Sequence, residues 1–155
     1  MTDLEQKVQR MQDLEDIRDL PRRYAHLVWQ GKPIETVDLF CADGIVDLGP
    51  EDGGEIRGAE NLRAIYSEKV GTDQMMLHPF VHNHVIDLNG DHASGTAYLD
   101  LRCIKDGESL MGSGYYEDQY IREQGKWKFK KRRLTVCYLV PPGQSWNQSR
   151  RLTDD

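Results

Sequence analysis

The first thirty residues carry apolar side chains at helical spacing. The positions recur at intervals of three and four residues: Leu4, Val8, Met11, Leu14, Ile17 and Leu20. This periodicity predicts one amphipathic helix over residues 2 to 30. Thr2 and Glu5 have the spacing of a capping box at its start. Pro21 is expected to kink the helix or split it, and Gly31 to end it.

Shorter elements are expected next. Residues 33–40 begin with a proline, which suits a first helical turn, and they predict a short helix. Residues 45–48 predict a short strand, and a smaller edge strand is expected near Ile56. A second helix is expected over about residues 59–70, with Gly71 as its C-cap.

The pattern changes to β-strands from residue 80 onward. Three turn dipeptides divide this part of the chain: Asn89-Gly90, Asp106-Gly107 and Gln124-Gly125. Such dipeptides between β-rich runs are strong hairpin signals, so four consecutive strands are predicted. They span about residues 80–88, 92–103, 111–122 and 127–139. Strands of about ten residues tend to bend, and Gly95, Gly112 and Gly114 are expected to ease that bend.

Helices followed by an antiparallel meander indicate an α+β fold. In such a fold the helices cover one face of a strongly curved, mainly antiparallel sheet. The two layers form a cone, and its interior is the expected place for a ligand pocket. The 155 residues fit one domain over residues 1–140, followed by an irregular tail over residues 141–155.

The composition narrows the classes of function. A net charge of −6 argues against a nucleic-acid partner, and the basic run KWKFKKRR at residues 126–133 is interpreted as a strand with a solvated face. Three cysteines without CxxC spacing argue against a disulfide framework and fit a reducing cytoplasm. No apolar run has the length of a membrane span, and the polar N-terminus does not look like a signal peptide. No phosphate loop or dinucleotide fingerprint occurs, so no cofactor is expected.

Four segments carry motifs that occur together in a known family: RRYAHLVWQGKPIETVDLFCADGIVDLG, IRGAENLRAIY, HNHVIDLNGDHASGTAYL and GYYEDQYIREQGKWKFKKRRL. In this order they resemble the SnoaL-like family of the nuclear transport factor 2-like superfamily, over about residues 10–140. The resemblance implies an α+β cone with a deep pocket. The superfamily includes polyketide cyclases, scytalone dehydratase, bile acid dehydratase, a dehydrochlorinase and ketosteroid isomerase, so a lyase or isomerase without a cofactor is implied.

The resemblance assigns site roles to two residues of the first helix. Tyr24 matches a pocket tyrosine of the family's dehydratases, whose phenol donates to a substrate oxygen; the alternative is a core tyrosine with its hydroxyl satisfied inside the protein. Trp29 stands where many family enzymes have an aspartate that acts as a base or orients the catalytic histidine. Because tryptophan does neither, a simple His–Asp dyad is not predicted, and Trp29 is expected to form an apolar pocket wall.

The segment HPFVHNH places three histidines around Asn83, which matches an asparagine of the family. In a regular strand Asn83 shares a face with Pro79, where the family's catalytic histidine falls, whereas His82 and His84 share the other face. A bulge beside Pro79 would turn His78 or His82 inward. His82 is the first choice for a catalytic histidine and His78 is the second. The alternative leaves His82 and His84 on the outer face of the sheet.

Two aspartates of later strands are also candidates. Asp100 would be a usable acid or base if burial raised its pKa; the alternative is an exposed or paired aspartate opposite the apolar face. Asp118 is expected to pair with Arg132 or Arg133, which is a structural role.

Two functions remain open. One is a dehydratase- or cyclase-like lyase or isomerase acting on a hydrophobic, oxygenated ring compound, in which Tyr24 polarises an oxygen and a histidine moves a proton. The other is a non-catalytic ligand-binding or assembly module, which Trp29 favours. No metal is expected, because His82 and His84 have no third ligand at a suitable spacing. A wider set of side chains is expected to contact the ligand: Trp29, Phe40, Val81, Asn83, Tyr98 and Tyr116.

The expected partners are a small hydrophobic ligand and a second copy of the chain. A homodimer is expected through the outer face of the sheet, because Phe80, Ile86 and Leu88 are assigned to that face and would need covering. Neither a nucleic acid nor a membrane is expected as a partner.

Overall fold

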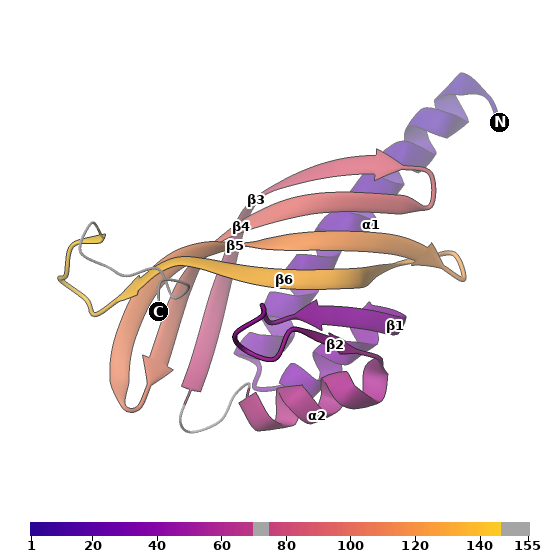
Figure 1. Cartoon of the computed structure of the whole chain (residues 1–155). Coiled ribbons are helices and arrows are strands. Elements are labelled where there is room, and N and C mark those ends of the chain that lie inside the picture. The colour runs from indigo at the N-terminus through magenta and orange to yellow at the C-terminus, as the bar shows by residue number, and fades with distance from the viewer. Residues whose placement is uncertain (70–74, 147–155) are drawn as a thin grey trace.

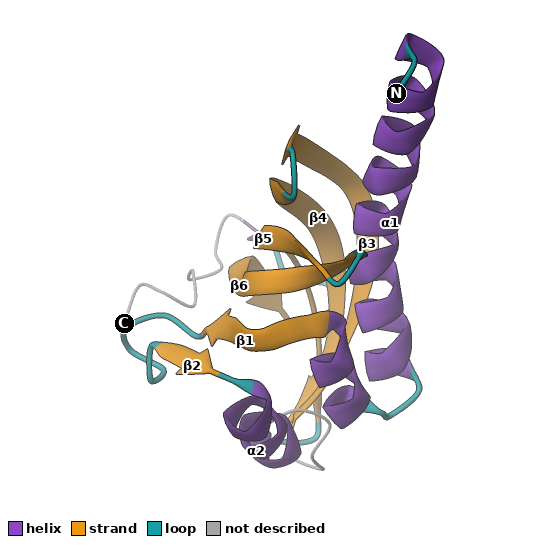
Figure 2. Ribbon diagram, turned by 90° about the vertical axis from the view of Figure 1, so that its right-hand side faces the viewer, coloured by secondary structure: helices purple, strands orange, loops and turns teal. Residues whose placement is uncertain are grey.

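The computed structural model describes residues 1–69 and 75–146, in two layers. One layer is a six-stranded, mostly antiparallel sheet, and the other consists of helices on one face of it (Figures 1 and 2). The long strands curve, so that sheet and helices form a cone (Figure 1). The predicted α+β cone is confirmed. The predicted cap at Gly71 and the end of the predicted tail lie outside the described residues.

The chain begins with α1 (Asp3–Trp29), the 3-10 helix η1 (Pro33–Leu39), β1 (Phe40–Asp47), β2 (Glu55–Arg57) and α2 (Ala59–Lys69). Four long strands follow: β3 (Met75–Asn89), β4 (His92–Lys105), β5 (Glu108–Glu123) and β6 (Lys126–Val140). The predicted helices and strands are present, and the four late strands are longer than expected. No helix in the described part of the chain combines the length and apolar character that crossing a bilayer requires.

The start of α1 is capped as predicted. The backbone N–H of Thr2 donates to the Glu5 carboxylate at 2.6 Å, and the backbone N–H of Glu5 donates to the Thr2 hydroxyl at 3.2 Å. This reciprocal pair satisfies two N–H groups that have no partner within the helix. Pro21 lies inside α1 and does not split it.

Only the second half of the apolar stripe of α1 is buried. Ile17 and Leu20 reach the core, whereas Leu4, Val8 and Met11 are exposed. The reason is visible in Figure 1, where the N-terminal turns of α1 extend beyond the edge of the sheet. The remaining turns pack on β3 and bring the middle of α1 next to the cone interior.

The strand order is β2-β1-β6-β5-β4-β3, so the predicted meander forms one side of the sheet. β1 joins its other side parallel to β6 and pairs with β2. At Gly112 and Gly114 a Cβ atom would lie 2.1 Å and 2.3 Å from the carbonyl oxygens of Tyr138 and Thr135 on β6. These two glycines therefore allow a close approach of two strand backbones that no other residue would tolerate.

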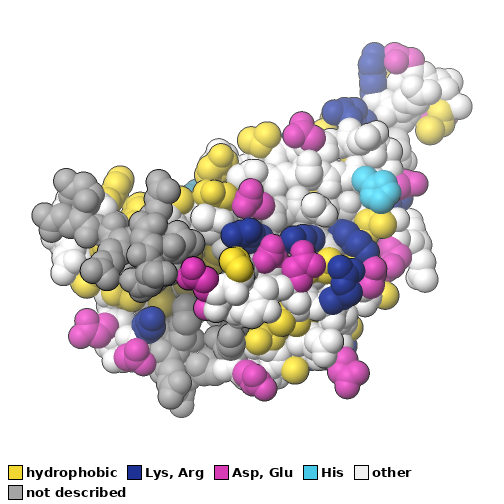
Figure 3. Space-filling model, in the orientation of Figure 1, with side chains coloured by type: hydrophobic (Ala, Val, Ile, Leu, Met, Phe, Trp, Pro, Cys, Tyr) yellow, Lys and Arg dark blue, Asp and Glu magenta, His cyan; other side chains and the backbone are white. Residues whose placement is uncertain are grey.

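The basic run of β6 lies among acidic side chains. Lys130 pairs with Asp43 at 2.6 Å, and Lys131 pairs with Asp47 at 3.0 Å and with Glu55 at 2.7 Å. Figure 3 shows charges of both signs interleaved across the middle of one face. The run forms a strand with one charge-paired outer face, as the sequence indicates.

The interior is packed between the helices and the inner face of the sheet. Its largest contributions come from leucine, isoleucine and aromatic side chains: Ile17, Leu20, Tyr24, Leu62, Tyr66, Leu99, Leu101, Tyr116, Tyr120 and Phe129. Five of these ten are aromatic, so rings fill much of the middle of the cone. Polar groups in this interior need partners within the protein.

Candidate functional site

A β-bulge in β3 decides which side chains face the interior. Val81 pairs with Leu99 of β4, but the next registered partner, His84, pairs with Ala97. Between these two pairs, His82 and Asn83 of β3 oppose the single residue Tyr98 of β4, which is the signature of one inserted residue. Paired residues share a face, and Leu99 and Ala97 are both buried. The bulge therefore turns His84 into the cone.

The predicted register of β3 is wrong. The bulge follows Val81 instead of lying beside Pro79, and it turns His84 inward instead of His82 or His78. His82 and Asn83 are exposed, so Asn83 does not face inward either. The physical reason is the position of the inserted residue, because every side chain after it changes face.

Gly95 of β4 makes room for the imidazole. A Cβ atom at position 95 would lie 2.9 Å from His84 Nε2 and 2.8 Å from the carbonyl oxygen of Val85. Both distances are below van der Waals contact, so any larger residue would displace the ring or the strand. Gly95 therefore leaves space for the His84 ring, in addition to any effect on strand curvature.

A chain of hydrogen bonds leads from His84 into the interior. His84 Nε2 lies 3.0 Å from the Tyr120 hydroxyl, which donates to Asp118 Oδ2 at 2.9 Å. Because the phenol gives its one hydrogen to the carboxylate, Nε2 must carry the imidazole hydrogen and donate to the phenol oxygen. The other nitrogen, Nδ1, is then an unprotonated base. It is buried and has no hydrogen-bond partner among the described residues.

The surroundings of His84 keep it neutral. Burial is the largest cause and lowers the pKa of His84 to about 4. The carboxylate of Asp118 opposes this, and the guanidinium groups of Arg132, Arg18 and Arg22 add to it. At neutral pH the imidazole is uncharged, and the lone pair of Nδ1 is available to accept a proton.

Asp118 pairs with Arg132, which is one of the two pairings that the sequence predicts. The guanidinium donates from Nε and Nη2 to the two carboxylate oxygens, each at 2.8 Å, and both side chains are at most 2% exposed. The rings of Tyr24, Tyr116 and Phe129 surround the guanidinium, with centroids 4.4, 3.7 and 4.1 Å from its carbon. Burial disfavours the charged guanidinium, but Asp118 outweighs it and holds the pKa of Arg132 above its ordinary value. The Asp118–Arg132 pair forms the inner end of the hydrogen-bond chain that starts at His84.

Tyr24 lies in this interior with its hydroxyl already bonded. Its oxygen is 2.7 Å from that of Tyr66, and both tyrosines are buried. Burial raises the pKa of both phenols, that of Tyr66 to about 12. The geometry is that of a core tyrosine with a protein partner, and the predicted contact of Tyr24 with a substrate stays a prediction.

A cavity of about 190 Å³ lies at the seam between α1 and β3. Five residues line it: Arg18, Arg22, Val81, His82 and His84. A dry cavity of about 150 Å³ is enough to hold benzene, so this one has room for a single substituted ring. The seam cavity is therefore our candidate site, because it combines such a space with a buried base.

His82 and Asp100 meet on the outer face of the sheet. His82 Nε2 lies 3.2 Å from one oxygen of Asp100, and the Ser113 hydroxyl donates to the other at 2.8 Å. The hydrogen bond from Ser113, with the help of His82, holds the pKa of Asp100 below its ordinary value. The predicted buried acid with a raised pKa is therefore wrong, and the alternative of a paired, half-exposed aspartate is confirmed.

Trp29 and His78 lie together at the edge of β3. Their rings are stacked with centroids 3.9 Å apart, and Trp29 Nε1 donates to the carbonyl oxygen of Pro79 at 2.9 Å. Trp29 thus covers the outside of the strand, where it also contacts Phe80. It does not line the seam cavity, which corrects its predicted place as a pocket wall.

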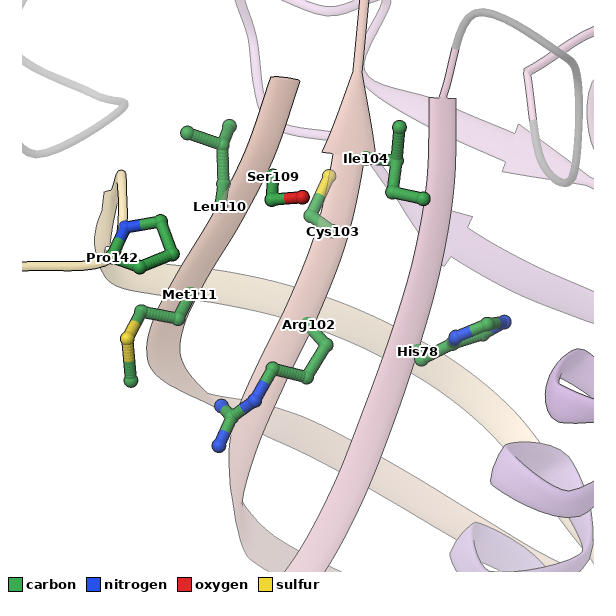
Figure 4. Close-up of a pocket in the computed structure, with 8 residues that line it drawn as sticks. All are labelled: His78, Arg102, Cys103, Ile104, Ser109, Leu110, Met111 and Pro142. Atoms are coloured by element: carbon green, nitrogen blue, oxygen red, sulfur yellow. The ribbon is translucent and has the colours of Figure 1, made fainter. Parts of the chain in front are cut away.

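A second cavity, of about 230 Å³, lies at the far end of β3, β4 and β5 (Figure 4). Its walls are largely apolar and include Cys103, Leu110 and Met111. Figure 4 shows that His78, its one histidine, points away from Leu110 and Met111 towards the helices. The imidazole is held by the stack on α1, so this cavity offers less acid–base chemistry than the seam.

The other expected contacts are spread over the fold. Phe40 is buried against Phe129 in the core, with ring centroids 5.1 Å apart. Tyr98 is 44% exposed and pairs with Tyr115 on the outer face, because its neighbours in β4 take the inner face. Of the predicted set, Val81 and His82 line the seam cavity. Within residues 1–69 and 75–146, no group of three or more His, Cys, Asp or Glu side chains is arranged to hold a metal ion.

Sequence reasoning missed His84 as the inward histidine. The sequence signal for it was a shift by one residue in the alternation of apolar side chains. Val81 is apolar at an odd position, whereas Ile86 and Leu88 are apolar at even positions. Both of these later residues pack against the core, so they are not on the outer face as expected. Tyr120, two residues after the paired Asp118, was missed because its role depends on contact between three strands.

Comparisons with known proteins agree with the fold. No curated protein matches the chain. A hexachlorocyclohexane dehydrochlorinase (LinA type 2) is 17% identical, with a TM-score of 0.75 over 90% of this chain and 95% of that one. A nuclear transport factor 2-like protein with a cystatin-like fold, from Novosphingobium aromaticivorans, is 17% identical, with a TM-score of 0.73 over 94% and 92%. A variant of Rv3472 from Mycobacterium tuberculosis, of unknown function, is 22% identical, with a TM-score of 0.70 over 90% and 79%.

At these identities the structural similarities show the fold alone. The family is shown by a different comparison, with the sequence pattern of the SnoaL-like domain. That pattern matches residues 9–133, which include most of the first helix, the bulged strand and the Asp118–Arg132 pair. The chain belongs to the SnoaL-like domain family.

Proposed function

We propose that this protein is a cofactor-independent lyase or isomerase that acts on an oxygenated compound with one ring. The observation that carries the proposal is the imidazole of His84, with a buried and unpartnered Nδ1, at a cavity of about 190 Å³. A neutral imidazole whose other nitrogen is fixed by a hydrogen bond has the form of a general base. Family membership supports the same class of chemistry.

The protein groups divide the work as follows. Nδ1 of His84 takes a proton from a ring carbon next to a carbonyl group; the C–H electron pair forms a C=C bond and the carbonyl oxygen becomes an enolate. In an isomerase, which acts on an unsaturated ketone, the enolate collapses and takes the proton back from the imidazolium at another carbon. In a lyase the enolate collapses and breaks the C–O bond at the next carbon, which leaves a C=C bond, and the imidazolium protonates the leaving hydroxide to give water. Tyr120 and Asp118 hold the tautomer and stabilise the imidazolium, since the phenol oxygen accepts from Nε2 and the carboxylate lies behind it.

The size of the cavity sets the substrate class. One six-membered ring with small substituents fits about 190 Å³, whereas a fused polycyclic compound does not. Val81 supplies an apolar wall, and the side chains of Arg18 and Arg22 supply donors for an oxygen of the substrate. These arginines take the role that the sequence had assigned to Tyr24.

A non-catalytic binding module is the second candidate. It is favoured by Trp29, which stands where many family enzymes have an aspartate and which stacks on His78. In this alternative the seam cavity binds a ligand and His84 only completes the buried hydrogen-bond chain.

Proton exchange distinguishes the two candidates without knowledge of the natural substrate. Cyclohexanone and 3-hydroxycyclohexanone are incubated in D₂O with the protein, and deuterium uptake next to the carbonyl is followed by NMR. We expect the wild type and the His92→Gln variant to accelerate uptake, and the His84→Gln variant to lose the acceleration. His92 is the control because it is an exposed histidine at the start of β4 and does not line the seam cavity. Equal uptake with wild type and His84→Gln rejects the catalytic role.

A further inference from the structure

The seam cavity carries more positive charge than the protein around it can balance. Arg18 and Arg22 lie one helical turn apart on α1, so they present neighbouring guanidinium groups to the same cavity wall. Both pair with a single carboxylate, that of Glu15. Two cations thus share one anion, in a chain whose net charge is −6.

The two arginines are held unequally. Arg22 Nη1 lies 2.6 Å from Glu15, which is a hydrogen-bonded ion pair, whereas Arg18 Nη1 lies 3.8 Å from the same carboxylate. The second distance exceeds hydrogen-bond length. Among the described residues Glu15 is the only acidic partner of Arg18, so its guanidinium keeps donors available. Arg23, next in the helix after Arg22, differs because it has Asp19 as a partner of its own.

The opposite wall of the cavity adds no negative charge. It consists of Val81, His82 and His84 of β3, and the nearby Asp100 is already bonded to His82. A planar guanidinium fork matches the two oxygens of a carboxylate. The small volume leaves room for that carboxylate and one ring.

We propose that the seam cavity binds the carboxylate of a monocyclic ring acid between Arg18 and Arg22. This inference rests on the proposed function and names its substrate class: a ring that bears both a carboxylate and the oxygen involved in the reaction. A bound carboxylate would also change the proton affinity of the base, His84. The positive charges of Arg18 and Arg22 help to keep His84 unprotonated, and a bound anion cancels them, so the substrate itself raises the proton affinity of Nδ1.

The groups that face His84 set how strong this effect is. Arg18 and Arg22 face it from α1, Asp118 from β5 and Arg132 from β6. The last two neutralise each other in a bidentate pair. The α1 arginines are therefore the charges that a ligand in the seam cavity can balance.

The test uses cyclohexanecarboxylate and its neutral isostere cyclohexanecarboxamide, titrated at constant ionic strength into ¹⁵N-labelled protein. The His84 imidazole resonances are the readout. We expect the carboxylate to shift them saturably and to bind about fivefold more tightly than the amide, the value of a partly exposed ion pair. The Arg18→Gln variant should lose this preference. The Glu15→Gln variant should bind the carboxylate more tightly, because it removes the competing anion.

Arg23→Gln is the matched control, because it removes a positive charge from the same helix turn but from a pair outside the cavity, and it should keep the preference. Equal affinity for the two probes, a preference that survives in Arg18→Gln, or no saturable shift at His84 overturns the proposal. Deuterium uptake that depends on His84 with no preference for the carboxylate rejects this inference and keeps the proposed function. A carboxylate preference without such uptake rejects the proposed catalytic function and keeps the carboxylate site.

Discussion

The neutral imidazole of His84 should make the stability of the fold depend on pH. Its pKa is about 4 in the fold, against an ordinary value of 6.5 that applies to the unfolded chain. Between these values the unfolded state binds a proton that the folded state does not, so acid favours unfolding. Because the folded-state pKa is the lowered one, the stabilisation is fully present above about pH 6.5 and is lost as the pH falls towards 4.

The difference of about 2.5 in pKa corresponds to a loss of roughly 3 kcal/mol in the free energy of unfolding over the whole range. Between about pH 7.5 and about pH 5 the loss from His84 is about 2 kcal/mol.

Urea unfolding of the wild type and of His84→Gln at these two pH values measures this loss. The variant should be less stable at pH 7.5, since Tyr120 loses its imidazole partner, but its stability should fall by about 2 kcal/mol less on acidification. Carboxylates such as Asp13, whose pKa is also lowered in the fold, contribute equally to both proteins and cancel in the difference. His92→Gln, which removes an exposed histidine at the start of β4, should follow the wild type. Equal pH dependence in wild type and His84→Gln would refute the buried, neutral imidazole.

Three further outcomes are expected. Gly95→Ala should lose about 1–3 kcal/mol of stability and the deuterium uptake, because the new methyl group displaces the His84 ring; full activity in a stable variant contradicts this. Arg132→Gln should cost about 3–5 kcal/mol in thermal or urea unfolding, because it leaves the Asp118 carboxylate buried without a cation, and a loss under 1 kcal/mol would argue against a buried pair. We also propose a homodimer through the outer sheet face, where Phe80 is 42% exposed; sedimentation should give a dimer that Phe80→Glu dissociates, and a monomeric wild type rejects it.

The order and type of the elements were predictable because the signals are local. Turn dipeptides such as Asn89-Gly90 mark hairpins by backbone geometry alone, and the capping box at Thr2 needs only four residues. The exposed N-terminal turns of α1 were not predictable in the same way. Periodicity predicts an apolar stripe from Leu4 to Leu20, but only the size of the sheet decides how far along the helix that stripe is covered.

The candidate site was predicted less well, because it depends on register. The histidine segment contributes two residues to the seam cavity, but the choice between His82 and His84 rests on one inserted residue. The two arginines of the seam look like ordinary solvent-facing residues on a helix. Only the packing of α1 on β3 brings Arg18 and Arg22 next to an imidazole that is more than sixty positions away in the chain.

The bulge in β3 absorbs a difference of one residue between two pairings with β4, which are set independently at the two ends of the strand. The Asn-Gly turn sets the pairing of Asn89 with His92, and the apolar residues near Val81 set the pairing at the other end. These two alignments differ by one residue, and the mismatch is taken up between them. A chain shortened by Asn83 alone would satisfy both ends with a regular strand and keep His84 inward. A deletion between His84 and Asn89 would also align both ends, but it would turn His84 to the outer face. Only a deletion at the bulge should therefore keep the imidazole in the interior.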